Sequence, residues 1–302
     1  MRASSLIAAL VTLLLAAPAQ AAKSFSKDIE TAKRIAETVQ ASIAAANTLM
    51  KKPHDPPKAN TFFALLHKDT WFVYFGWLEP DGSKFTPALV MAAPRHHFEQ
   101  MKQVELKDAP ADVLPFARAV TSSRATAMKA TGNPHVDPVL VPEKDGISVY
   151  VMQGGTREGA LLLGGDFLDR YDRAGTRLLS RLQYHKAVIA VPQSDPKHPE
   201  GKPAGSYHTH VIDEGPTPTD IAAVLLHPTL APMLITGRNG GGYRVDEQGN
   251  VHEEKDLNMA SLQTLPAQPE QPAIVAAPGA PDVPAADPKA APANAPAPAP
   301  SK

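Results

Sequence analysis

The chain has 302 residues, with 30 lysines and arginines against 31 aspartates and glutamates, and a formal net charge of −1. It contains no basic block and no polybasic segment beside an apolar run, so nucleic-acid binding is not expected. It also has no cysteine. This excludes disulfides, thiolate metal sites and a lipid-modified cysteine at a cleavage site.

Residues 1–21 have the pattern of a secretory signal peptide. Met1-Arg2 gives a positive start, residues 6–17 are apolar, and residues 19–21 form a small-x-small cleavage site. The apolar run is shorter than the ~20 residues needed to cross a bilayer, and no later run is long enough. We therefore expect a periplasmic or secreted protein with no transmembrane segment after cleavage.

The first predicted element is one long helix over residues 24–52, within an N-terminal segment of residues 22–60. Ser26 is the expected N-cap, and Pro53 ends the helix because proline cannot continue it. Small residues dominate the apolar stripe, which favours packing against a sheet over a dimeric coiled coil. The stripe consists of Ile29, Ala32, Ala36, Val39, Ile43, Ala46 and Met50.

Residues 61–262 are predicted to form one α+β domain. It opens with a hairpin of strands 70–78 and 84–91, joined by an Asp81-Gly82 turn. Helical pieces broken by Pro110 and Pro115 are expected over residues 94–131. Further strands are expected at 147–152, 160–163, 166–171, 177–184, 185–191 and 206–210.

A short helix over residues 218–226 and a strand at 233–236 should follow, before a final hairpin around residues 246–249. Strands outnumber helices, and hairpin-length turns join several neighbours. This favours an α+β fold with a mixed, mostly antiparallel sheet over a doubly wound parallel one.

The C-terminal residues 263–302 are rich in proline and alanine and have few large apolar side chains. Such a segment buries too little surface to offset its ordering entropy, so we expect a disordered tail. An inert tail is the favoured interpretation. A spacer or a Pro-rich ligand in the cell envelope is the alternative.

The strongest chemical signal is the run Ser206-Tyr-His208-Thr-His210, followed by Thr217-Pro-Thr-Asp220. Alternate side chains of a strand share one face, so both imidazoles project together and can bind one zinc at ~2.0–2.1 Å. Asp220 would supply an oxygen ligand, with water in the fourth position. Three protein ligands and one open position are typical of catalytic zinc.

A different interpretation of the same residues needs no metal. With Thr217 as N-cap, Asp220 is the third helical residue, so the segment is also a capping box. The two roles of Asp220 do not exclude each other. His185 ends a predicted strand and is interpreted as part of its rim.

The His-Thr-His pattern, a short loop and Thr217-x-x-Asp220 resemble the motif of the JAMM/MPN-type (JAB-type) zinc metallopeptidases, which cut isopeptide and peptide bonds. The motif covers roughly residues 204–226, with weaker similarity in strand order over about residues 60–250. The resemblance implies zinc ligation by His208, His210 and Asp220. It implies that Thr217 takes the place of a serine that helps hold the oxyanion.

The chain departs from that motif at three points. Val211 stands where the family usually has proline, and the loop before Thr217 is one residue shorter than usual. The catalytic glutamate has no clear counterpart, the candidates being Glu79, Glu143 and Glu158. The leading expectation is thus an exported zinc protein, with amide-bond hydrolysis as its activity. The alternatives are a non-catalytic envelope module that binds a peptide or protein, and a purely structural domain.

Overall fold

The structure is a computed structural model that describes residues 24–51, 58–154, 156–157, 160–192 and 205–254. All of these residues belong to one compact unit. The predicted signal peptide (1–21) and tail (263–302) lie outside the described residues. Within the described part, no helix is long and apolar enough to cross a membrane.

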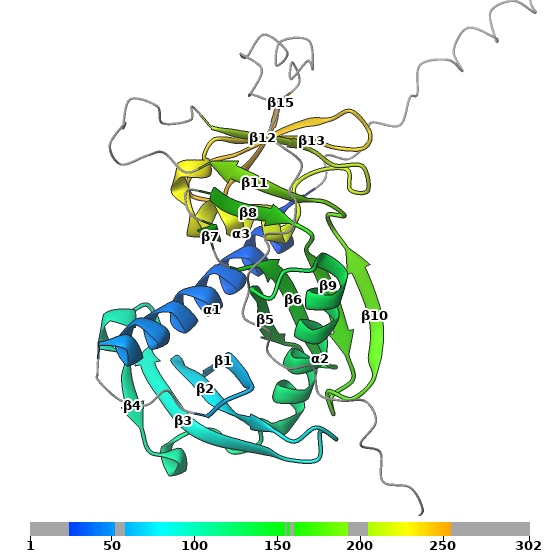
Figure 1. The fold of residues 1–302 in the computed structure, drawn as a ribbon. Helices are drawn as coiled ribbons and strands as arrows, with labels where there is room; N and C mark the ends of the chain where they lie inside the picture. Colours follow the sequence, from blue (N-terminus) through cyan, green and yellow to red (C-terminus); the bar gives the residue numbers. More distant parts are fainter. Residues whose placement is uncertain (1–23, 52–57, 155, 158–159, 193–204, 255–302) are drawn as a thin grey trace, which may run out of the picture. The chain divides into compact units, whose positions relative to one another are not determined.

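The described residues confirm the predicted α+β class, with three α-helices and four mostly antiparallel sheets (Figure 1). The α-helices are α1 (Ser26–Met50), α2 (Leu114–Thr131) and α3 (Pro218–Leu226). Short 3-10 turns occur at Phe98–Gln100, Leu106–Asp108 and Pro228–Leu230.

Two four-stranded antiparallel sheets form the first half of the fold. The first, in the order β1-β2-β3-β4, contains β1 (Thr61–His67), β2 (Thr70–Leu78), β3 (Phe85–Pro94) and β4 (Lys102–Val104). The second, in the order β10-β9-β6-β5, contains β5 (Val136–Pro142), β6 (Ile147–Gln153), β9 (Phe167–Tyr171) and β10 (Leu178–Gln183).

Two further sheets complete the described strands. The order β11-β8-β7 joins β7 (Thr156–Arg157), β8 (Ala160–Gly164) and β11 (Val188–Pro192). The order β12-β13-β14-β15 joins β12 (Ser206–Thr209), β13 (Met233–Thr236), β14 (Gly242–Val245) and β15 (Val251–Glu254). Among the described pairs, only β12 and β13 run parallel.

The predicted long helix is present, but the predicted N-cap and part of the predicted apolar stripe were wrong. Phe25, rather than Ser26, is the N-cap residue, and no side chain caps the helix. The exposed fractions of Ile43 (51%) and Met50 (76%) place both outside the core. Because α1 first packs with α3 and then crosses the β1–β4 sheet, its buried face changes along its length (Figure 1).

Residues 94–131 also differ from the prediction. Pro115 does not break a helix there but lies in the first turn of α2, where its missing N–H leaves no hydrogen bond unmade. Residues before it form short 3-10 turns and β4 instead. The short helix at 218–226 and the strand at 233–236 have the predicted bounds.

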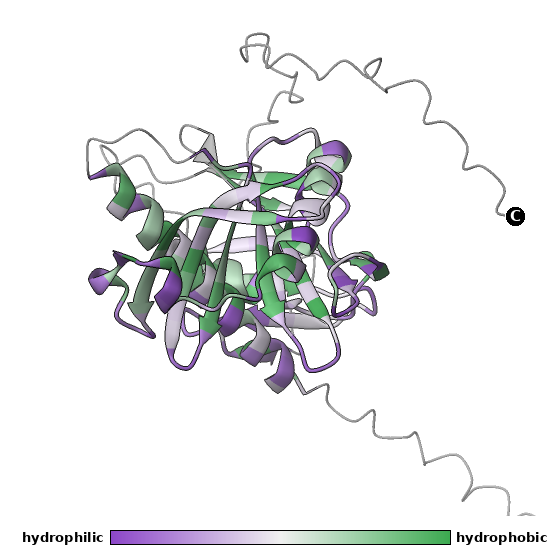
Figure 2. Cartoon of the chain, turned by 90° about the horizontal axis from the view of Figure 1, so that it is seen from below, coloured by the Kyte–Doolittle hydropathy of each residue, from purple (hydrophilic) through white to green (hydrophobic). Residues whose placement is uncertain are grey.

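Apolar residues are concentrated in the strands, and polar residues in the connecting turns (Figure 2). One buried cluster packs α1 and α3 against β5, β6 and β13 through residues such as Ile35, Val139, Ile221 and Ile235. This cluster fixes the start of α3 beside β12 and β13. It therefore positions the side chains described next.

Candidate metal centre

The β12 strand and the residue that follows it present two histidines on one side. Its parallel pairing with β13 places His208 opposite Ile235. The backbone N–H of His210 continues this pairing by donating to Thr236 O at 2.8 Å. Since alternate residues share a face, His208 and His210 project together, and their Nε2 atoms lie 3.0 Å apart.

Asp220 joins them from the first turn of α3. Its Oδ2 accepts the backbone N–H of Thr217 at 2.7 Å and the Thr217 hydroxyl at 2.6 Å. This confirms the predicted capping box. The other oxygen, Oδ1, lies 3.1 Å from His208 Nε2. Asp220 therefore caps the helix and faces the imidazoles at the same time.

His185 is a fourth member that the sequence analysis assigned to a strand rim. It lies in the connection between β10 and β11, and its Nε2 is 2.8 Å from His210 Nε2 and 3.4 Å from Asp220 Oδ1. The β9–β10 hairpin brings it there, because the Tyr184 N–H donates to Asp166 O at 3.1 Å. Asp166 then accepts the His185 Nδ1–H at 2.6 Å through its Oδ1.

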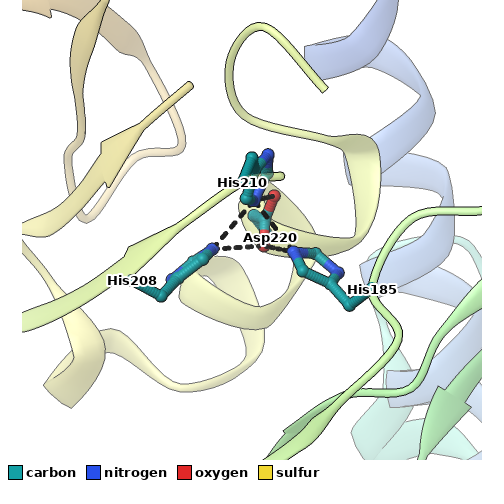
Figure 3. Close-up of side chains that lie close together, drawn as sticks. All are labelled: His185, His208, His210 and Asp220. Carbon is teal, nitrogen blue, oxygen red and sulfur yellow. Dashed lines mark hydrogen bonds and ion pairs between the residues drawn. The ribbon is translucent and has the colours of Figure 1, made fainter. Parts of the chain in front are cut away.

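Together the four side chains have the geometry of a metal site (Figure 3). His185, His208, His210 and Asp220 each offer one ligand atom, and these atoms lie within 4.8 Å of one another. Tetrahedral zinc with bonds of ~2.0–2.1 Å separates its ligand atoms by about 3.3 Å. The 2.8–3.4 Å separations described above are close to that value. The cluster could therefore hold a metal ion.

Hydrogen bonds on the far side of two rings point their Nε2 atoms at the centre. His210 Nδ1 lies 2.8 Å from Gly215 O, which can only accept, so Nδ1 carries the proton. Asp166 holds His185 in the same way. A neutral ring protonated at Nδ1 has its lone pair on Nε2, as a metal requires. Converging lone pairs repel one another unless a cation or proton lies between them.

The cluster is largely removed from solvent. The exposed side-chain fractions are 12% for His185, 10% for His208, 0% for His210 and 6% for Asp220. Burial lowers the pKa of His185, but the Asp166 hydrogen bond and the Asp220 charge outweigh it and raise that pKa to about 9. Burial raises the pKa of Asp220, yet His208, His210 and His185 hold it well below its usual value.

A small cavity adjoins the cluster. Its volume is about 30 Å³, and its polar side is formed by Asp166, His185, Thr219 and Asp220. A cavity needs roughly 10–15 Å³ to hold one water, so this one has room for about two. The lining also includes Gln153 and the apolar residues Met152, Leu162, Leu163, Ala223 and Met233.

The family resemblance connects Thr217 and a glutamate with catalysis. The Thr217 hydroxyl is buried in the cap, where it bonds Asp220 Oδ2 and lies 2.9 Å from Thr219 Oγ1. Its role toward an oxyanion stays a prediction. Glu143 accepts the Ser148 hydroxyl, and Glu158 lies outside the described residues. No glutamate of the described part belongs to the four-residue cluster.

No protein-family model, curated protein or solved structure matches this chain. The resemblance to JAMM/MPN-type peptidases therefore rests on the motif around His208, His210 and Asp220. It stays a prediction for fold and activity alike.

Proposed function

We propose that this chain is an exported zinc protein in which His185, His208, His210 and Asp220 bind one ion. The observation that carries the proposal is the convergence of three imidazole nitrogens and one carboxylate oxygen at separations suited to a tetrahedral cation. Export is supported by the charged start, apolar run and small-x-small site of residues 1–21.

Zinc is the metal that suits these donors best. Imidazole nitrogens with one carboxylate oxygen are common zinc ligands, and zinc favours four-coordinate tetrahedral sites. Calcium and magnesium favour sites built from six or more oxygens, which this cluster does not supply. The donor set contains no thiolate, as the absence of cysteine requires.

A structural role in a non-catalytic envelope module is the function that the geometry supports best. Four protein donors fill a tetrahedral shell, and closed shells are typical of structural zinc. The ion would fasten the β10–β11 connection to β12 and to the start of α3. Because a metal that binds only the folded state lowers the free energy of that state, it would stabilise the packing of these three segments.

Amide-bond hydrolysis at the same centre is the second candidate. It is favoured by the convergence of His208, His210 and Asp220, the three ligands that the JAMM/MPN resemblance implies. Water would have to replace one protein donor, and His185 is the donor contributed by a separate segment. Bound zinc would then lower the pKa of that water towards ~7.

Metal content tests the site directly. We expect the purified full chain to hold about one zinc per molecule, since four donors define one tetrahedral site. His208→Ala should lose it. His252→Ala is the matched control, because His252 pairs with Asp246 on the surface and lies outside the cluster. Zinc-free wild type, or equal zinc in both variants, would overturn the proposal.

X-ray absorption at the zinc edge separates the two roles. A closed shell predicts three imidazole ligands and one carboxylate with no water, and no turnover of isopeptide or cell-wall peptide substrates. Hydrolysis that disappears in His208→Ala but survives in His185→Ala would instead establish the enzyme. In that case the structural role is wrong and His185 is dispensable for chemistry.

A further inference from the structure

Two adjacent glycines lie directly before Asp166, at the point where β8 ends. Gly164 (φ 77°) and Gly165 (φ 62°) both have a left-handed backbone conformation, which residues with a Cβ adopt only at a cost. With Asp166 they form the connection from β8 to β9. This pair, the glycine turn, therefore leads into the carboxylate that accepts the His185 Nδ1–H.

The space beside both glycines is too small for a side chain. A Cβ on Gly164 would collide with the carbonyl oxygen of Ala187 and would lie 3.4 Å from the Cβ of His185. A Cβ on Gly165 would lie 2.7 Å from Val188 Cγ2. Val188 is also the register partner of Gly164 in the β8–β11 pair. The missing Cβ atoms thus allow the β10–β11 connection to lie directly against the glycine turn.

Asp166 then holds that connection at two points. Its backbone oxygen accepts the N–H groups of Tyr184 at 3.1 Å and of His185 at 3.4 Å. Its carboxylate accepts the His185 Nδ1–H at 2.6 Å and also the Thr219 hydroxyl. Both the backbone and the ring of His185 are therefore placed by the residue that follows the glycine turn.

His185 is the donor whose placement depends most on this contact. His208 and His210 come from β12 and the residue after it, and Asp220 comes from the first turn of α3. His185 comes from the β10–β11 connection and reaches the cluster from the side opposite His208 (Figure 3). Without it three protein donors would remain. Three donors leave a zinc position open to water, whereas four close the shell.

We propose that the glycine turn is a positioning element that decides whether the zinc shell is closed. It holds Asp166 against the β10–β11 connection and so makes His185 the fourth donor. A side chain at either glycine would push the connection away, and the site would keep three donors and take up water. The claim about the shell rests on the proposed zinc site. The placement of His185 by the turn can be tested without metal.

The test uses Gly165→Ala in the full chain, because its new Cβ would meet a side chain rather than the backbone. In the metal-free wild type, proton NMR should show a downfield His185 Nδ1–H resonance, since a hydrogen bond to a buried carboxylate is short. His185→Ala identifies this resonance by its absence. Gly165→Ala should lose it as well.

The zinc measurements follow on the same proteins. Chelator competition should show that Gly165→Ala binds zinc about 10–100-fold more weakly, the usual effect of disturbing the partner behind a ligand. X-ray absorption should show two imidazoles, one carboxylate and a water in the variant, against three imidazoles and one carboxylate in the wild type.

A second substitution separates the steric cause from a general loss of stability. Val188→Ala removes the Cγ2 atom that the new Cβ would contact, so Gly165→Ala with Val188→Ala should recover part of the zinc affinity and the resonance. The double variant also keeps the test possible if Gly165→Ala alone does not fold.

Gly175→Ala is the matched control. Gly175 also has a left-handed backbone (φ 67°), and its Cβ would collide with the backbone of Pro115, but it lies in the turn between β9 and β10, at the end of that hairpin away from Asp166. This variant should melt at a lower temperature, with zinc affinity and the His185 resonance unchanged.

An unchanged resonance and a closed shell in folded Gly165→Ala would overturn the inference and leave the zinc site standing. An equal loss in Gly175→Ala would also overturn it, because lowered stability alone would then explain both. Zinc-free wild type would overturn the proposed function and the claim about the shell together, and the resonance would still decide whether the glycine turn places His185.

Discussion

Asp166 accepts a hydrogen bond from His185 at 2.6 Å and thereby fixes which nitrogen of that imidazole faces the cluster. The exposed side-chain fractions, 5% for Asp166 and 12% for His185, show that water competes little for this bond. Asp166 also accepts the Thr219 hydroxyl, so one carboxylate ties the β10–β11 connection to the first turn of α3. A carboxylate behind a histidine orients the ring and raises its basicity toward a metal.

We expect Asp166→Ala to weaken zinc binding by about 10–100-fold, the usual effect of losing a partner behind a metal ligand. Asp166→Asn should recover part of the affinity, because its amide oxygen can still accept the His185 Nδ1–H. Competition with a chelator measures both values. Circular dichroism first confirms that each variant is folded. Unchanged affinity in a folded Asp166→Ala protein would show that Asp166 does not orient a ligand.

Two substitutions at Asp220 separate its two roles. Asparagine keeps an oxygen that can accept the Thr217 N–H but removes the charge, whereas alanine removes both. We expect both variants to lose zinc. In the metal-free state, Asp220→Ala should be about 1 kcal/mol less stable than Asp220→Asn, because only alanine loses the side-chain oxygen that accepts the Thr217 N–H. Urea unfolding without metal measures the difference, and equal stabilities would mean that this hydrogen bond contributes nothing.

Zinc affinity should rise with pH because of His185. Its pKa in the folded, metal-free protein is about 9, above the ~6.5 of an unfolded chain. The proton therefore stabilises the metal-free fold fully below about pH 6.5, and this contribution is lost as pH rises through about 9. Zinc needs the ring without that proton, so affinity should rise up to about tenfold per unit between about pH 7 and 9.

The measurement is chelator competition at several pH values, with the chelator's own protonation taken into account. A flat profile would contradict the prediction. His67 offers the matched control, since its substitution should leave the pH profile intact; it ends β1 and lies outside the cluster. At lower pH, zinc should also raise the melting temperature by a smaller amount.

Three of the four cluster members were predictable because their relation is local. The two-residue spacing of His208 and His210 on a strand and the three-residue spacing from Thr217 to Asp220 both place side chains without knowledge of the fold. His185 could not be placed in this way. Its approach depends on how the β9–β10 hairpin packs beside β12, and that is set by tertiary contacts rather than by a sequence pattern.

Most strands and the α+β class follow from the alternation and the turns, but β1 and β5 were missed for physical reasons. The β1–β2 turn uses Lys68 and Asp69, both with positive φ (47° and 58°), and so lacks the glycine that normally marks such a turn. β5 contains Pro138, and proline within a run argues against a strand unless it lies at an edge. The sheet order places β5 at an edge, where its proline is tolerated.

The Arg181–Asp169 pair gives a last prediction, in which the two partners respond unequally. Asp169 is fully buried and also accepts the Ser123 hydroxyl at 2.7 Å, whereas Arg181 is 32% exposed on its edge strand. Arg181→Ala leaves a buried carboxylate without its cation and should cost about 3 kcal/mol of unfolding free energy. Asp169→Asn leaves a partly exposed guanidinium that water can solvate, so this substitution should cost only about 1–2 kcal/mol of unfolding free energy. Denaturant unfolding of both variants measures the two losses of unfolding free energy. A larger loss in Asp169→Asn than in Arg181→Ala would contradict the prediction, because it would mean that the unpaired arginine is more destabilising than the unpaired buried acid.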